Sequence, residues 1–132
     1  MVQENTGILL VQSDLNKIVS MSEKCISAGI DDETIYATVY GEDIQKFLMS
    51  KGIGTVIIDA DMYNMETASI LKAYSSFSDL DVILVTKTAM KKTIRMIMDE
   101  NLKYINAEIS SEDLARVLGI YQPFWFKKVV HL

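Results

Sequence analysis

The chain carries three short runs of consecutive apolar residues, and each run is followed by a segment with helical spacing. The runs are GILLVQ (7–12), TVIID (55–59) and DVILVT (81–86). A strand that is apolar at nearly every position is buried on both faces, as in a parallel sheet covered by helices. Two further β-branched or aromatic segments, TIYATVY (34–40) and KYIN (103–106), complete five strand–helix units. The pattern predicts an α/β fold built on a five-stranded parallel sheet.

The segments between these strands have recognisable helix signals. Asp14 stands at an N-cap position and Gly29 ends the first helix, whose inward face we expect to be Leu15, Ile18, Val19, Cys25 and Ile26. Residues 42–52 place acids in the first turn and Lys51 at the end, which would complement the helix dipole. Further helices are predicted over 66–77, with Ile70, Leu71 and Tyr74 inward, over 89–101, and over 110–121 with Ser110 or Ser111 as the N-cap and Leu114, Val117, Leu118 and Tyr121 inward.

Right-handed crossovers between parallel strands lead to a doubly wound, flavodoxin-like (βα)5 sheet with strand order 2-1-3-4-5. We expect one domain over residues 1–120, followed by an aromatic tail or the start of a linker over 121–132, which contains Phe124, Trp125 and Phe126. Ligands of such folds bind beyond the carboxyl ends of the strands. Asp59 and Thr86 end two of the strands, so we expect them to share that crevice.

The composition excludes several classes of function. The net charge of −5 argues against nucleic-acid binding, because phosphate backbones attract basic faces. The single cysteine, Cys25, cannot form an internal disulfide, and no signal pattern or membrane-length apolar run is present, so a cytoplasmic location is expected. The single histidine, His131, has no partner at a spacing typical of a metal site or a catalytic dyad. Without a nucleophile–base pair or a glycine-rich phosphate loop, we do not expect an enzyme.

The stretch VIIDADMYNMETASILKAY (56–74) resembles the receiver domain of two-component response regulators. In that family the third strand ends in the phosphate-accepting aspartate, and a turn with two methionines follows. Asp59, Met62 and Met65 fall in register, whereas Tyr63 stands where the family has proline. The resemblance covers roughly residues 7–120. It implies that Asp59 holds the phosphoacceptor position, that Thr86 holds the switch hydroxyl position, and that Tyr104 holds the switch aromatic position.

The same comparison also shows departures from the family. Gln12 and Ser13 occupy the positions of the acidic pair that helps to hold Mg²⁺, and Asp14 comes one residue too late, where it serves better as a helix cap. Ala107 stands where the family has its phosphate-binding lysine. Lys87 could replace that lysine or point to solvent. We therefore expect no cofactor, and expect the Asp59 carboxylate to accept hydrogen bonds from Thr86 or from backbone N–H groups.

Three hypotheses follow. The favoured one is an atypical, pseudo-receiver-like domain that acts through protein–protein contacts in two-component-type signal transduction, with weak or no phosphorylation at Asp59. The second is a conventional phosphoacceptor that uses Mg²⁺, and the third is a small flavodoxin-like enzyme. The expected partners are proteins, such as a histidine kinase or an output domain, rather than nucleic acid or membrane. A homodimer through the fourth helix, fifth strand and fifth helix, extended by the tail, is a further expectation.

Overall fold

The computed structural model describes residues 6–76, 78–86 and 102–120. Five parallel strands form one sheet in the order β2-β1-β3-β4-β5. Their bounds are Gly7–Val11 (β1), Ile35–Thr38 (β2), Ile53–Asp59 (β3), Asp81–Thr86 (β4) and Lys103–Asn106 (β5). The predicted fold class and strand order are confirmed.

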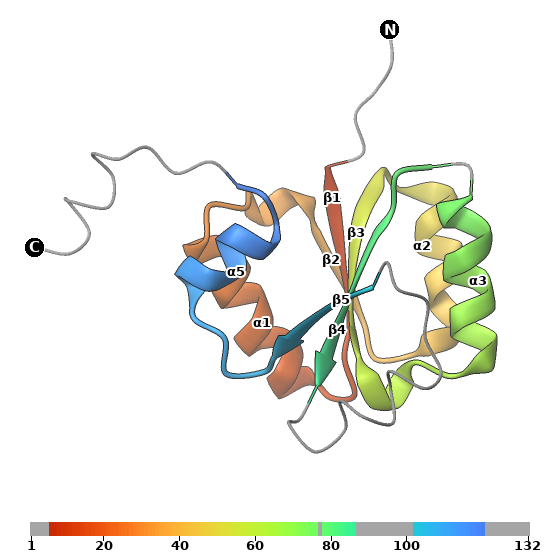
Figure 1. The fold of residues 1–132 in the computed structure, drawn as a ribbon, viewed down its shortest axis with the longest axis horizontal. Helices are drawn as coiled ribbons and strands as arrows, with labels where there is room; N and C mark the ends of the chain where they lie inside the picture. The colour runs from red at the N-terminus through yellow and green to blue at the C-terminus, as the bar shows by residue number, and fades with distance from the viewer. Residues whose placement is uncertain (1–5, 77, 87–101, 121–132) are drawn as a thin grey trace, which may run out of the picture.

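Helices cover both faces of this sheet (Figure 1). Helices α1 (Leu15–Ser27) and α5 (Ser111–Val117) lie on one side, and α2 (Ile44–Ser50) and α3 (Met65–Ser75) lie on the other. Short 3-10 turns, Asp32–Thr34 (η1), Gly41–Asp43 (η2) and Ala60–Met62 (η3), precede β2, α2 and the turn into α3. The helix predicted over 89–101 and the aromatic tail over 121–132 lie outside the described residues.

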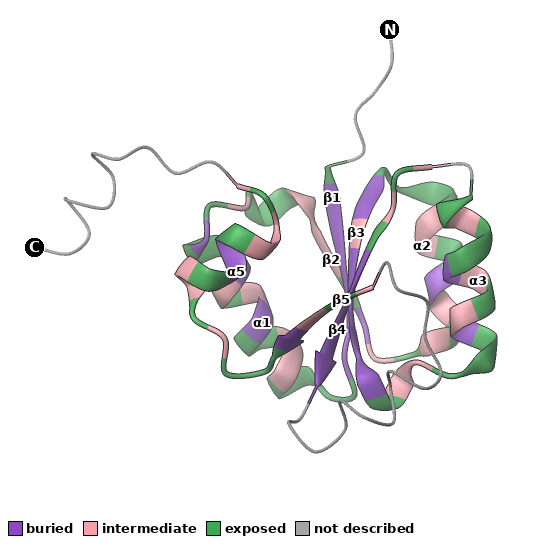
Figure 2. Cartoon of the chain, in the orientation of Figure 1, coloured by how far each residue is buried: buried purple, intermediate pink, exposed green. Residues whose placement is uncertain are grey.

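Alternate side chains of the central strands fill two separate cores. Leu9, Val11, Val56, Ile58 and Leu84 pack on the side of α2 and α3. Ile8, Leu10, Ile57 and Ile83 pack on the side of α1 and α5. The strands are therefore buried on both faces, as their unbroken apolar runs predicted (Figure 2).

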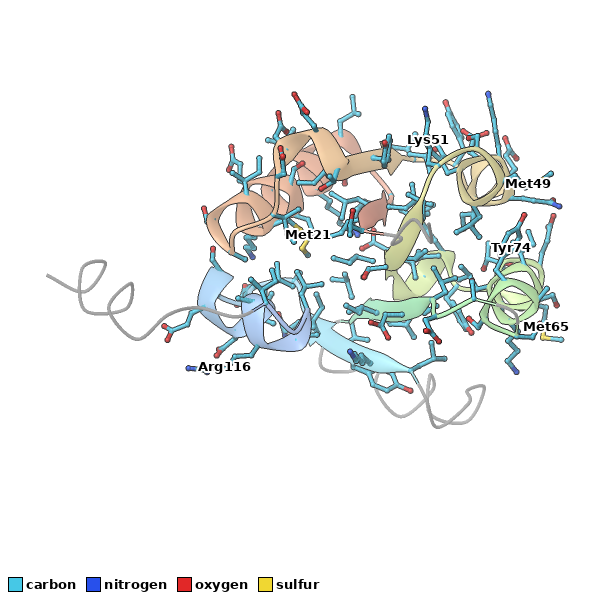
Figure 3. All side chains as sticks on the ribbon, turned by 90° about the horizontal axis from the view of Figure 1, so that it is seen from above. Met21, Met49, Lys51, Met65, Tyr74 and Arg116 are labelled. Atoms are coloured by element: carbon cyan, nitrogen blue, oxygen red, sulfur yellow. The ribbon has the colours of Figure 1, made fainter. Side chains whose placement is uncertain are left out.

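The inward face predicted for the first helix is largely wrong. Met21 and Cys25 are the buried residues of α1, whereas Leu15, Val19 and Ile26 are exposed, Leu15 by 70%. Figure 3 shows Met21 pointing from α1 into the space between that helix and α5. Successive helical residues are about 100° apart, so Val19 and Met21 lie on nearly opposite sides. Packing against the sheet and α5 selects the Met21–Cys25 side, and the three exposed side chains form a stripe on the outer surface.

Helix ends follow the predicted signals in part. Asp14 caps α1 by accepting a hydrogen bond from the Lys17 backbone N–H at 2.9 Å, and Ser110 caps α5. Gly29 and Gly119 adopt positive φ just past the ends of these two helices. The dipole prediction for the second helix is confirmed only in part. Lys51 is the C-cap of α2, but Glu42 and Asp43 lie in the preceding 3-10 turn, so α2 has no acid in its first turn.

Cys25 provides a test of this packing. Its side chain is fully buried, and burial raises the pKa of the thiol from 9.0 to about 11. Because the thiolate is the reactive form, labelling by a disulfide reagent at pH 8 should be at least roughly 100-fold slower in the folded chain than in urea. The unfolded state releases this proton first, so stability should fall as pH rises from about 9 to 11. Equal labelling rates with and without urea would contradict the buried position.

Candidate functional site

The carboxyl ends of the central strands surround a cavity of about 340 Å³. Asp59 ends β3 and Thr86 ends β4, and the register pairs Asp59 with Val85, which places Thr86 one residue further along the neighbouring strand. Both side chains line this cavity, together with Gln12, Asp14, Lys17 and Ala107. The prediction that Asp59 and Thr86 share one crevice is confirmed.

The Asp59 carboxylate is buried and fully engaged on one of its oxygens. Only 4% of the residue is exposed. Its Oδ2 atom accepts a hydrogen bond from the Ser13 backbone N–H at 2.7 Å. The Lys17 ammonium lies 3.5 Å from the same oxygen and donates to Ser13 Oγ at 2.9 Å. The predicted backbone N–H donor is confirmed, and a positive charge also neutralises the buried carboxylate.

Lys17 is a residue of this site that was not predicted from the sequence. It is the third residue after the Asp14 cap, so it lies in the first turn of α1, where the chain leaves the carboxyl end of β1. A long side chain at that position reaches the same edge of the sheet as Asp59. The signal was the N-cap itself, which fixes where the first helical turn begins. A lysine was expected only after the fourth or fifth strand, at Lys87 or at the position of Ala107.

Thr86 makes a different hydrogen bond from the one expected. Its side chain is buried, and Oγ1 donates to the Ile105 carbonyl of the adjacent β5 at 3.4 Å. A hydroxyl carries one proton, so this contact directs it across the β4–β5 pair rather than toward the carboxylate. Of the two kinds of donor expected for Asp59, the backbone N–H is therefore the one observed, although Thr86 and Asp59 face the same cavity.

The residues around Asp59 do not fit a divalent cation. Gln12 is buried and its amide donates to the Ile57 carbonyl at 3.5 Å, and Ser13 uses its N–H on Asp59. Asp14 is committed to the α1 cap. Mg²⁺ is usually held by one or two carboxylates and several waters, whereas here an ammonium already lies beside the buried carboxylate. Across the described ranges, no group of three His, Cys, Asp or Glu side chains is placed to hold a metal ion.

The remaining predicted positions lie around the rim of the sheet. Tyr104 is half-buried on β5 and packs against the core on the side of α2 and α3. Ala107 lines the cavity, and its carbonyl accepts a hydrogen bond from Lys24 Nζ of α1. Two lysines of α1 thus contact residues of the cavity, Lys17 at Asp59 and Lys24 at Ala107. Lys87 lies outside the described residues.

The turn after Asp59 ends in a capping box, which was not predicted from the sequence. Asn64 Oδ1 accepts from the Thr67 N–H at 3.0 Å, and Thr67 Oγ1 accepts from the Asn64 N–H at 2.9 Å. The same Thr67 hydroxyl donates to the Met62 carbonyl at 3.0 Å. Thr67 therefore fixes the start of α3. The N-x-x-T spacing could have revealed it.

Solved structures with this fold include several receiver domains. The chain superposes on a response regulator receiver domain protein from Clostridium thermocellum with a TM-score of 0.68 and 16% identity, covering 86% of this chain and 90% of that one. The N-terminal domain of a response regulator/sensory box/GGDEF three-domain protein from Carboxydothermus hydrogenoformans gives a TM-score of 0.63 at 16% identity, covering 86% and 91% of the two chains.

A pilus assembly-related protein from Burkholderia pseudomallei is similar as well, with a TM-score of 0.66, 17% identity and coverage of 92% and 97%. No family model and no curated protein sequence matches the chain. Within the described residues, no helix is both long and apolar enough to cross a membrane. The structure therefore has a receiver-like fold, with Asp59 in the cavity at the carboxyl edge of its sheet.

Proposed function

We propose that the chain is an atypical receiver domain that signals through protein–protein contacts in a two-component-type pathway, with weak or no phosphorylation at Asp59. One observation carries this proposal. The Asp59 carboxylate is already paired with the Lys17 ammonium and the Ser13 N–H, while the neighbouring Gln12 and Ser13 offer no second carboxylate. The domain would act in the cytoplasm, as a binding module rather than as an enzyme.

The pairing of Asp59 and the lack of a second carboxylate should greatly slow phosphoryl transfer. A metal ion stabilises the charge of a transferring phosphoryl group by several kcal/mol. Losing about 3 kcal/mol of that stabilisation slows the reaction roughly 100-fold. The alanine at position 107 further removes a fixed positive charge on the far side of the cavity. Lys17 could supply one charge, but in doing so it would leave Asp59.

A conventional phosphoacceptor is the second candidate, and the cavity itself favours it. A space of about 340 Å³ beside Asp59, lined by Lys17 and Thr86, is large enough for a phosphoryl group and several waters. A cognate kinase would then have to supply what the site lacks. The two candidates differ in what happens at Asp59 when a small phosphodonor is offered without a kinase.

Incubation with a small acyl phosphate and Mg²⁺, followed by intact mass measurement, tests this difference. We expect little or no added phosphate on the wild-type chain, for the reasons given above. Asp59→Asn is the matched control, because it keeps the shape of the side chain and removes the acceptor. Stoichiometric phosphate on the wild type that is lost in Asp59→Asn would restore the conventional receiver.

The contact surface we propose is the face of the predicted fourth helix, β5 and α5, extended by residues 121–132. It follows from the apolar Met90, Ile94 and Met98 and from the aromatic tail in the sequence. If a second copy binds there, deletion of 122–132 should lower the mass measured by light scattering. Val19→Lys, which alters an exposed apolar residue of α1, is the control and should change nothing. A monomeric mass before and after the deletion would argue against this surface.

A further inference from the structure

We propose that Lys17 closes the Asp59 site against divalent cations, by holding its own ammonium group where such an ion would have to bind. This inference rests on the proposed function, in which the site works without metal. It assigns the exclusion of metal to Lys17 and predicts that substitution of this residue allows metal to bind.

The geometry is a closed ring of polar contacts. Asp59 Oδ2 accepts from the Ser13 N–H at 2.7 Å and lies 3.5 Å from Lys17 Nζ. Lys17 Nζ in turn donates to Ser13 Oγ at 2.9 Å. The ring joins the β1–α1 connection to the end of β3, so one oxygen of the carboxylate faces both a fixed N–H and a tethered positive charge.

Lys17 is held in this position by its own helical turn. Its backbone N–H is bound by the Asp14 cap, which sets the start of α1, and its side chain spans a single helical turn back to Ser13. The side chain lines the cavity and is 42% exposed, and its ammonium contacts both Asp59 and Ser13. Because the ammonium is covalently attached next to the site, its local concentration does not depend on the cations in solution.

A metal ion would meet this ammonium directly. Mg²⁺ binds a carboxylate oxygen at about 2.1 Å, so an ion on Oδ2 would come within a few ångströms of Lys17 Nζ. The repulsion between a divalent ion and an ammonium about 4 Å apart is twice that between two unit charges, and it should lower the affinity of the ion by at least about tenfold. Asp14 and Asp61 also line the cavity, but both are exposed and Asp14 caps α1, so Asp59 is the only buried carboxylate of the described part of the chain.

The test measures Mn²⁺ binding by electron paramagnetic resonance in four chains: wild type, Ser13→Asp, Lys17→Met, and the double variant. Ser13→Asp adds a second carboxylate next to Asp59. We expect it to bind Mn²⁺ weakly while Lys17 is present, and the double variant to bind at least about tenfold more tightly. Adding Asp59→Asn to the double variant should remove the gain. A chain with Ser13→Asp and Lys17→Arg keeps the positive charge, so it should also lack the gain in Mn²⁺ affinity.

Equal affinity of Ser13→Asp and the double variant would overturn the inference, as would weak binding by both. If the double variant does not fold, as judged by circular dichroism, the single Lys17→Met chain decides: tighter Mn²⁺ binding than the wild type supports the inference and unchanged binding overturns it. Neither result alters the phosphorylation test of the wild-type chain, so a failure here is distinguishable from a failure of the proposed function.

Discussion

Replacing Leu9 by alanine should lower the free energy of unfolding by about 3–4 kcal/mol. Leu9 is fully buried on β1, a strand that pairs with β2 on one side and β3 on the other, and it belongs to the core beneath α2 and α3. The substitution removes apolar contacts and leaves a cavity that a central strand cannot close by moving. Urea denaturation followed by circular dichroism measures the change.

Leu15→Ala is the matched control, because it makes the same chemical change on a residue that is 70% exposed. Alanine is also the best helix former, so α1 should lose at most about 0.5 kcal/mol. A large loss at Leu15 would show that the outer stripe of α1 is covered in the folded chain. A small loss at Leu9 would contradict the double-sided burial of the sheet.

Lys17→Met should destabilise the chain by about 1–2 kcal/mol, because it leaves the buried Asp59 carboxylate without its positive partner. The expected value lies below the range for fully buried ion pairs, since solvent reaches the exposed part of the lysine. Methionine keeps most of the aliphatic stem and favours helix, so the loss reports mainly on the charge.

The Asp59→Asn background separates the pair from other effects of the substitution. There Lys17→Met should cost at most about 0.5 kcal/mol, giving a coupling energy of roughly 1 kcal/mol in the double-mutant cycle. The coupling should shrink in high salt, because the ammonium is partly exposed. An equal cost of Lys17→Met in both backgrounds would mean that the two groups do not interact in solution.

Strand positions were the most predictable part of the fold. Runs such as DVILVT have no polar alternation, and only a sheet covered on both faces can bury them, which also favours parallel pairing. The face of α1 that is buried could not be predicted in the same way. Its sequence offers two apolar faces, one through Leu15 and Val19 and one through Met21 and Cys25, and only tertiary packing against α5 decides between them.

The backbone of the site was predictable, whereas its hydrogen bonds were predictable only in part. Asp59 and Thr86 meet because parallel strands end at one edge, which the sequence order implies. The partner of each side chain depends on distances of a few tenths of an ångström across different elements. Thr86 donates to Ile105 of the neighbouring strand, and Lys17 reaches Asp59 from a helix that is 42 residues away in sequence.

The central claim is that Asp59 keeps the receiver position without its phosphoryl chemistry. A titration with fluoroberyllate and Mg²⁺ tests this claim most directly. Heteronuclear NMR would follow the backbone amides of Ser13, Asp59 and Thr86. Fluoroberyllate imitates a phosphoryl group on a carboxylate, and with Mg²⁺ it would have to bind beside the Lys17 ammonium. We expect these amide signals to stay in place at millimolar concentrations. Saturable shifts at the three amides that vanish in Asp59→Asn would contradict our proposal.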